Sequence, residues 1–200
     1  MKRIRIIELS VALGLLCSIV FSVAGFGVSC ENIRNSVIRL HILANSDSAE
    51  DQAVKLVVRD ELLKSGNELF SGNLSPENAY MCIESNKEEL MVYINKILES
   101  NGFDYKSEIS LVKEYFGTRS YEEFTMPAGE YLALKVVLGN GDGHNWWCVM
   151  FPPLCLPAAA DNNDLDMIFN NDCKEIVKSS PDYEIRFKIV EIIERLKHRI

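Results

Sequence analysis

Apolar and polar residues alternate along residues 37–44 (VIRLHILA), the first regular pattern behind the N-terminal segment. A period of two predicts a half-buried β-strand, with its polar side chains on the open face. Four polar residues, 45–48, interrupt the pattern, and apolar residues then recur at helical spacing up to Gly66. Ser48, followed by Asp51 three positions later, matches the capping box that opens many helices. The first unit is therefore a strand, a short polar turn and a helix.

The same kind of pattern predicts further elements along the chain. Residues 75–77 (SPE) mark a second helix start, with proline at the tolerated first position, and helical spacing continues to Asn101-Gly102. Strand patterns follow at 105–116, 131–138 and 145–151, and a closing amphipathic helix follows at 182–200.

A glycine-rich turn, residues 139–143 (GNGDG), joins the last two predicted strands. Such a turn between two β-prone runs predicts a β-hairpin, and the prolines at 152–153 end its second strand. The element order predicts an α+β fold: a mainly antiparallel sheet with a central hairpin, packed by several helices. Residues 31–200 are expected to form this single domain, with residues 158–166 as a small acidic connector.

The first residues have the layout of an export signal. A basic cluster at residues 2–5 precedes an apolar run from Leu9 to Val23, and Ser22 and Ala24 stand at the −3 and −1 positions of a cleavage site. We therefore expect residues 1–24 to be a signal peptide. An uncleaved anchor is the alternative, because extending the run to Val28 reaches the length of a membrane-spanning helix.

Charge excludes two classes of partner. The chain has 21 basic and 29 acidic residues; removing residues 1–24 leaves 18 and 28, a net charge of −10. Nucleic-acid binding needs a basic surface, and adhesion to anionic lipid needs one too. The sequence predicts no nucleic-acid partner, and contact with a membrane only through the N-terminal segment.

Five of the six cysteines remain after cleavage, and in an exported protein they can pair. Cys148 and Cys155 are separated by the stiff Pro152-Pro153 pair, so we predict a disulfide between them, with two reduced thiols as the alternative. No C-x-x-C spacing occurs, so neither a zinc site nor a thioredoxin-type site is expected.

No arrangement of residues predicts catalysis. His144 and Cys148 are four residues apart on a turn and strand, too far for a thiol and its base unless the chain folds back. The glycines of residues 139–143 lead into a strand and not a helix, so they do not form a phosphate loop. We expect no catalytic residue, no metal and no cofactor.

Two groups of residues are candidates for binding a partner. Trp146, Trp147 and Phe151 offer a large apolar area beside the glycine-rich turn, and an exposed tryptophan often anchors an interface. Consecutive strand residues point to opposite faces, so one tryptophan is expected inside. The second group, His41, Asn45 and Asp47, lies at the end of the first strand, although a turn and a buried histidine would explain it too.

Two long segments carry a resemblance to a known family. Residues 127–155 (PAGEYLALKVVLGNGDGHNWWCVMFPPLC) and 39–60 (RLHILANSDSAEDQAVKLVVRD) are similar to the signature regions of stage II sporulation protein R, in the same order and behind an export segment. The similarity extends over roughly residues 35 to 155.

The resemblance implies a signalling role in endospore formation. Such proteins are made in the forespore and secreted into the intermembrane space. There they activate a membrane-embedded aspartic protease of the mother cell, which processes pro-sigma-E. Two other functions stay open: an envelope enzyme, such as a thiol or cell-wall hydrolase, and a passive envelope ligand-binding module.

Overall fold

The computed structural model describes residues 2–70, 75–121, 124–152, 154, 169, 171–178 and 184–198. The predicted connector at 158–166 lies outside the described residues. The helices are α1 (Lys2–Asn35), α2 (Ala49–Leu69), α3 (Pro76–Ser100), α5 (Asn171–Lys178) and α6 (Glu184–His198). The strands are β1 (Ile38–Leu43), β2 (Ser107–Phe116), β3 (Arg119–Ser120), β4 (Thr125–Met126), β5 (Gly129–Leu138) and β6 (Asn145–Phe151).

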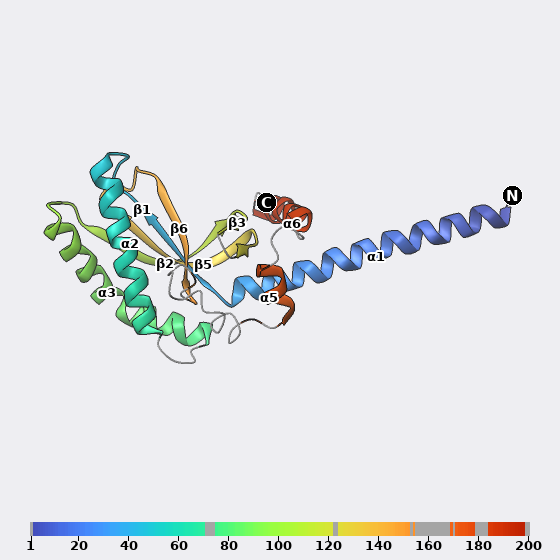
Figure 1. Cartoon of the computed structure of the whole chain (residues 1–200), viewed down its shortest axis with the longest axis horizontal. Coiled ribbons are helices and arrows are strands. Elements are labelled where there is room, and N and C mark those ends of the chain that lie inside the picture. Colours follow the sequence, from blue (N-terminus) through green and yellow to red (C-terminus); the bar gives the residue numbers. More distant parts are fainter. Residues whose placement is uncertain are drawn as a thin grey trace.

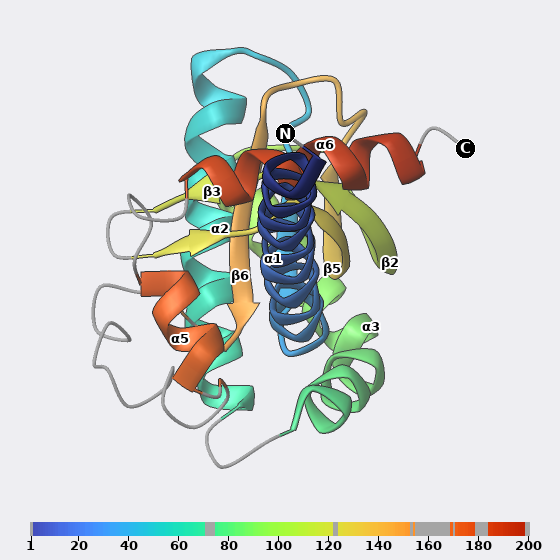
Figure 2. The same ribbon diagram turned by 90° about the vertical axis from the view of Figure 1, so that its right-hand side faces the viewer.

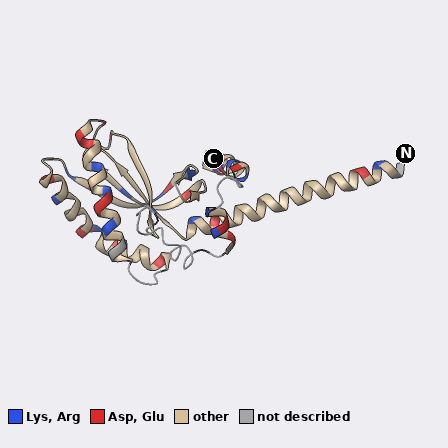
Figure 3. Cartoon of the chain, in the orientation of Figure 1, with Lys and Arg blue, Asp and Glu red and all other residues tan. Residues whose placement is uncertain are grey.

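Helix α1 projects from the domain as one continuous rod (Figure 1). Its apolar side chains from Ile4 to Phe21 are exposed, and its charges gather towards its two ends (Figure 3). The helix is long and apolar enough to cross a membrane, and a signal sequence near the N-terminus has the same properties. The structure is therefore compatible with either predicted use of the segment.

The main sheet has the strand order β2-β5-β1-β6. The pairs β2–β5 and β1–β6 are antiparallel, and β1–β5 is parallel. The α+β class with a mainly antiparallel sheet is confirmed. The hairpin prediction is wrong, because β1 lies between β5 and β6 and pairs with both. The turn that joins β5 to β6 therefore spans two strand spacings, about 10 Å, across the end of β1.

Helices α2 and α3 cover one face of the sheet (Figure 1). Helix α2 begins after Ser48, whose hydroxyl accepts a hydrogen bond from Asp51 N at 3.1 Å, as the predicted cap requires. The helix continues through Gly66, where a stop was predicted, and ends at Leu69. Helix α3 starts at its predicted cap, Ser75, which accepts from Asn78 N at 3.3 Å.

The end of α1, the β3–β4 ribbon, α5 and α6 cover the opposite face (Figure 2). Phe26 and Ile33 of α1 are buried there against the sheet. This cover corrects the prediction for β1: the strand is not half-buried, since Arg39 and His41 are also buried, at 0% and 3% exposure. Alternation reveals which residues share a face, but not whether a second layer covers the polar one.

Candidate functional site

Two loops meet at the end of β1 and form a rim, which we define as residues 44–48 and 139–144. Several hydrogen bonds join them, among them Gly143 N to Ala44 O at 2.9 Å, Asp142 N to Asn45 O at 3.1 Å, and Asn140 N to Asn45 Oδ1 at 3.0 Å. Backbone N–H groups of the 139–144 loop thus donate to oxygen atoms of the 44–48 loop. The rim is a single structure built from two distant parts of the chain.

The glycines of the turn are needed for this close approach. A Cβ on Gly139 would lie 2.2 Å from Asn45 Oδ1, and one on Gly143 would lie 2.2 Å from Ser46 O. Gly139 also has a φ of +57°, which L side chains rarely adopt. The GNGDG sequence therefore serves to cross β1 and touch the 44–48 loop, and not to close a hairpin.

Beneath the rim, the buried carboxylate of Asp51 holds the 44–48 loop. It accepts hydrogen bonds from Asn45 Nδ2 at 2.9 Å, the Ser46 hydroxyl at 2.5 Å and the Tyr105 hydroxyl at 2.7 Å. Burial raises the pKa of this carboxyl, but the hydrogen bonds outweigh burial and hold the pKa below its ordinary value. Asp51 stays ionised and fixes the 44–48 loop on α2.

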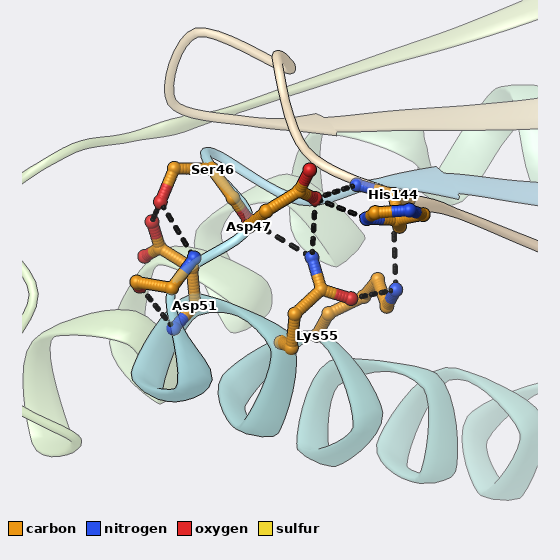
Figure 4. Close-up of polar contacts among 7 residues, drawn as sticks. Ser46, Asp47, Asp51, Lys55 and His144 are labelled. Atoms are coloured by element: carbon orange, nitrogen blue, oxygen red, sulfur yellow. Dashed lines mark hydrogen bonds and ion pairs between the residues drawn. The ribbon is translucent and has the colours of Figure 1, made fainter.

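Asp47 and His144 form the outer edge of the rim (Figure 4). Asp47 Oδ1 accepts from the His144 backbone N at 2.6 Å and also contacts His144 Nδ1, and these hydrogen bonds lower the pKa of Asp47. Their side chains remain 55% and 78% exposed. Lys55, buried below them, donates to His144 O at 2.9 Å and to Gln52 Oε1 at 2.6 Å, and burial lowers its pKa. A rigid base thus presents an acidic and a basic side chain to solvent.

His41 is a satisfied buried histidine. Its Nδ1 lies 2.8 Å from Glu114 Oε2, and its Nε2 lies 2.8 Å from Asn145 Oδ1. Its ring stacks on Trp147 with 3.6 Å between centroids and 16° between planes. The residue links three strands and holds Trp147, and it does not reach the rim surface. Of the predicted group, only Asn45 and Asp47 lie in the rim.

The two tryptophans lie on opposite faces of the sheet, as the alternation predicted. Both are half-buried, and each ring has an arginine near it: Arg59 lies 4.4 Å from the Trp146 ring, and Arg119 lies 5.8 Å from that of Trp147. Neither offers the fully exposed ring that would favour an anchor. A role for either in binding a partner stays a prediction.

Phe151 belongs to the core and not to an accessible surface. It is 3% exposed and packs edge-on against Phe70, with ring centroids 5.3 Å apart. Its place among the candidate contact residues is therefore corrected. Phe151 is the last residue of β6, and it lies in the core cluster that α2 covers.

His144 and Cys148 do not meet as nucleophile and base. Cys148 is buried at 2% exposure and disulfide-bonded, so it supplies no thiolate. Its predicted partner, Cys155, lies outside the described residues, and the pairing of the two stays a prediction. Among the described residues, no group of three or more His, Cys, Asp or Glu side chains is placed to hold a metal ion.

Sequence reasoning missed Asp51, Lys55 and Tyr105 as parts of the site. One signal was available, because Asp51 and Lys55 are four residues apart and so share a helix face. The capping role of Asp51 concealed its second role under the rim. Tyr105 gave no signal, since it is 54 residues distant along the chain from Asp51.

Comparison with known proteins identifies the family. The fold and the apolar helix define an α+β domain carried behind a segment of the signal or anchor type. The chain belongs to the stage II sporulation protein R family, which it matches over residues 34–161, and its role is in sporulation.

One curated relative is Stage II sporulation protein R of Bacillus subtilis (strain 168), which is 42% identical over 123 residues. The match covers 62% of this chain and 55% of that protein, so the chain spans about half the length of the relative. No solved structure matches the chain.

Proposed function

We propose that this chain is a signalling protein secreted across the forespore membrane, and that it activates a membrane-embedded aspartic protease which processes pro-sigma-E. The sporulation family and the apolar α1 helix support this role. The rim is the contact surface for the protease in this proposal. Activation requires recognition and not chemistry by this chain.

One observation carries the proposal: the two segments that resemble the family, 39–60 and 127–155, touch each other at the rim. Residues far apart in the sequence are held in one rigid surface by backbone hydrogen bonds and by Asp51. Sites that bind partners are commonly loops placed by a rigid scaffold. Asp47 and His144 are exposed on this surface, as are Ser48, Asn140 and Asp142, so a partner can reach them.

The test removes these two side chains without disturbing the rim beneath. The chain, the protease and pro-sigma-E are expressed together in a heterologous host, and cleavage of pro-sigma-E is followed by immunoblot. Asp47→Asn keeps an acceptor for the His144 backbone, and His144→Ala keeps its N–H, so we expect both variants to melt like the parent. We expect each variant to reduce cleavage strongly, since removing one member of a charge pair across an interface weakens binding.

Glu84→Gln is the matched control, because it breaks an exposed ion pair with Lys87, 2.6 Å long, on α3 and away from the rim. With this variant, pro-sigma-E should be cleaved to the same extent as with the parent chain. Full cleavage with both rim variants would place the contact surface elsewhere, and cleavage without this chain would remove its role as activator.

A further inference from the structure

Helix α6 turns one of its faces towards the domain. Phe187 and Val190 are buried on this inner face, and the Phe187 ring packs edge-on against Phe26 of α1 with centroids 5.4 Å apart. Glu194 lies on the same face, 3.7 Å from Arg34 of α1. These contacts fix the rotation of α6 about its own axis.

The opposite face of α6 is apolar and open. Ile185, Ile192, Ile193 and Leu196 are exposed at 77%, 55%, 40% and 58%. At 100° per residue these positions, together with Ile189, fall within one stripe, directly across the helix from Phe187. A surface helix normally carries charged residues on its outer face. Here the outer face is the more apolar of the two, and nothing in the core requires it.

Basic residues border the apolar stripe on both sides. Lys188 and Arg195 flank one edge, and Arg186 and Lys197 flank the other. Lys188 and Arg195 pair with Glu191 at 3.3 and 2.6 Å, and Lys197 pairs with Glu194 at 2.9 Å. Glu191 and Glu194 are thus neutralised on the inner side. A stripe of branched aliphatic residues between long basic side chains is typical of a helix that lies in a membrane surface.

The position of α6 identifies the surface that covers it. In Figure 1, α6 lies on the side of the domain from which α1 projects, and Figure 2 shows it crossing α1. Beyond the domain, α1 exposes 18 residues from Ile4 to Phe21, which at 1.5 Å per residue span about 27 Å, close to the thickness of a hydrocarbon core. A bilayer entered by this part of α1 faces α6.

We propose that α6 is an interfacial helix, with its stripe of Ile185, Ile189, Ile192, Ile193 and Leu196 lying in the bilayer surface next to α1. Buried apolar area drives the contact, so it does not require a basic net charge on the domain. This revises the sequence-based expectation that only the N-terminal segment contacts the membrane. The proposal does not depend on protease activation, and its test uses no protease.

The experiment labels the full chain with a phospholipid that carries a photoactivated diazirine on its acyl chain. The chain is reconstituted in vesicles of phosphatidylcholine, alone or mixed with phosphatidylglycerol, and tryptic peptides are analysed by mass spectrometry. Peptide 189–195 reports α6. Peptide 88–96 of α3 is the internal control, because its Val92 is 51% exposed, close to the 55% of Ile192. We expect label on 189–195 well above the level of 88–96, with and without anionic lipid.

The double variant Ile192→Glu and Leu196→Glu should lower the label on 189–195 to the level of 88–96 without changing the melting temperature, since both side chains are exposed. Val92→Glu should leave the labelling unchanged. Label on 189–195 no higher than on 88–96 would overturn the proposal and favour a protein partner or a second copy of the chain. Label that appears only with anionic lipid would overturn the apolar contact.

Discussion

The two faces of the sheet are built on different principles. Towards α2 and α3, β1 contributes the apolar side chains of Ile38, Leu40 and Ile42. Towards α1 and α6, the same strand contributes Arg39 and His41, which lie among aromatic rings. The first face keeps its polar network at the edge, under the rim, whereas the second has its polar network within the core.

Two arginines make this difference visible. Arg39 lies 4.4 Å from the ring of Phe116, and Arg59 lies 4.4 Å from the ring of Trp146. The first is fully buried, while the side chain of the second is 21% exposed. The two contacts have the same distance but differ in exposure, and cation–π contacts contribute more when they are desolvated, so we expect the Arg39 contact to stabilise the fold more.

The faces also differ in which parts of the chain they need. The α2/α3 face is complete between residues 38 and 151. The other face needs Phe26 and Ile33 from α1, and Phe187 and Val190 from α6. The apolar N-terminal helix is therefore partly a segment outside the domain and partly a piece of its core.

The largest effect should come from removing the end of α1. A chain that begins at Gly25 keeps Phe26 and Ile33, whereas one that begins at Ser36 loses both. Each fully buried side chain of this size stabilises the fold by about 1.5–3 kcal/mol, so the shorter chain should lose roughly 3–6 kcal/mol of unfolding free energy. Melting followed by circular dichroism, with the detergent-solubilised full chain as reference, checks this. Equal melting of the two truncated chains would show that α1 is no part of the core.

The next effect concerns the two arginines compared above, Arg39 and Arg59. Arg39→Ala opens a cavity and removes the donor to Cys148 O and to the Tyr121 hydroxyl, both at 2.8 Å. We expect a loss of about 3–5 kcal/mol, and about 0.5–1 kcal/mol for the matched Arg59→Ala. Urea unfolding of both variants measures the difference. Arg39→Met restores volume without a buried charge and should recover part of the loss. Similar losses for Arg39→Ala and Arg59→Ala would contradict the role of burial.

A smaller effect should appear at the rim in acid. Because the pKa of Asp51 is lowered in the folded chain, its contribution to stability is present above the ordinary carboxyl pKa of about 4 and is lost as pH falls through the lowered value. Asp51→Asn should melt earlier at neutral pH and lose less on acidification than the parent. Melting temperatures across the acid range check this, with exposed Glu84→Gln as the control. Parallel pH curves for Asp51→Asn and the parent would assign the acid loss to other carboxyls.

Local signals in the sequence predicted most of the elements but not how they pair. The bounds of β6 were correct, because a glycine-rich turn precedes it and prolines follow it. The start of α3 was correct because Ser75-Pro76 is a strong cap. The β3–β4 ribbon and α5 were not predicted, since two-residue strands and an eight-residue helix depend on tertiary contacts more than on their own sequence.

The candidate site shows the same limit. Asn45 and Asp47 were recognised as strand-end residues, and the turn was recognised by its glycines. The two loops touch because β1 is inserted between β5 and β6. Strand pairing of this kind could not be predicted from the sequence pattern. The buried arginine, Arg39, was likewise read as solvent-facing, because the aromatic rings around it, those of Phe116, Tyr121 and Tyr131, come from distant parts of the chain.

The insertion of β1 has a consequence for the timing of folding. This strand leaves the ribosome first among those of the sheet, yet its parallel partner is β5, with Leu40 beside Leu134, and its other partner is β6. Contacts so distant along the chain form late, since a long loop must close before they are made. The sheet is complete only after residue 151 has emerged. Until then the domain cannot complete its fold, and only a chain that is not yet folded can be threaded through a narrow channel.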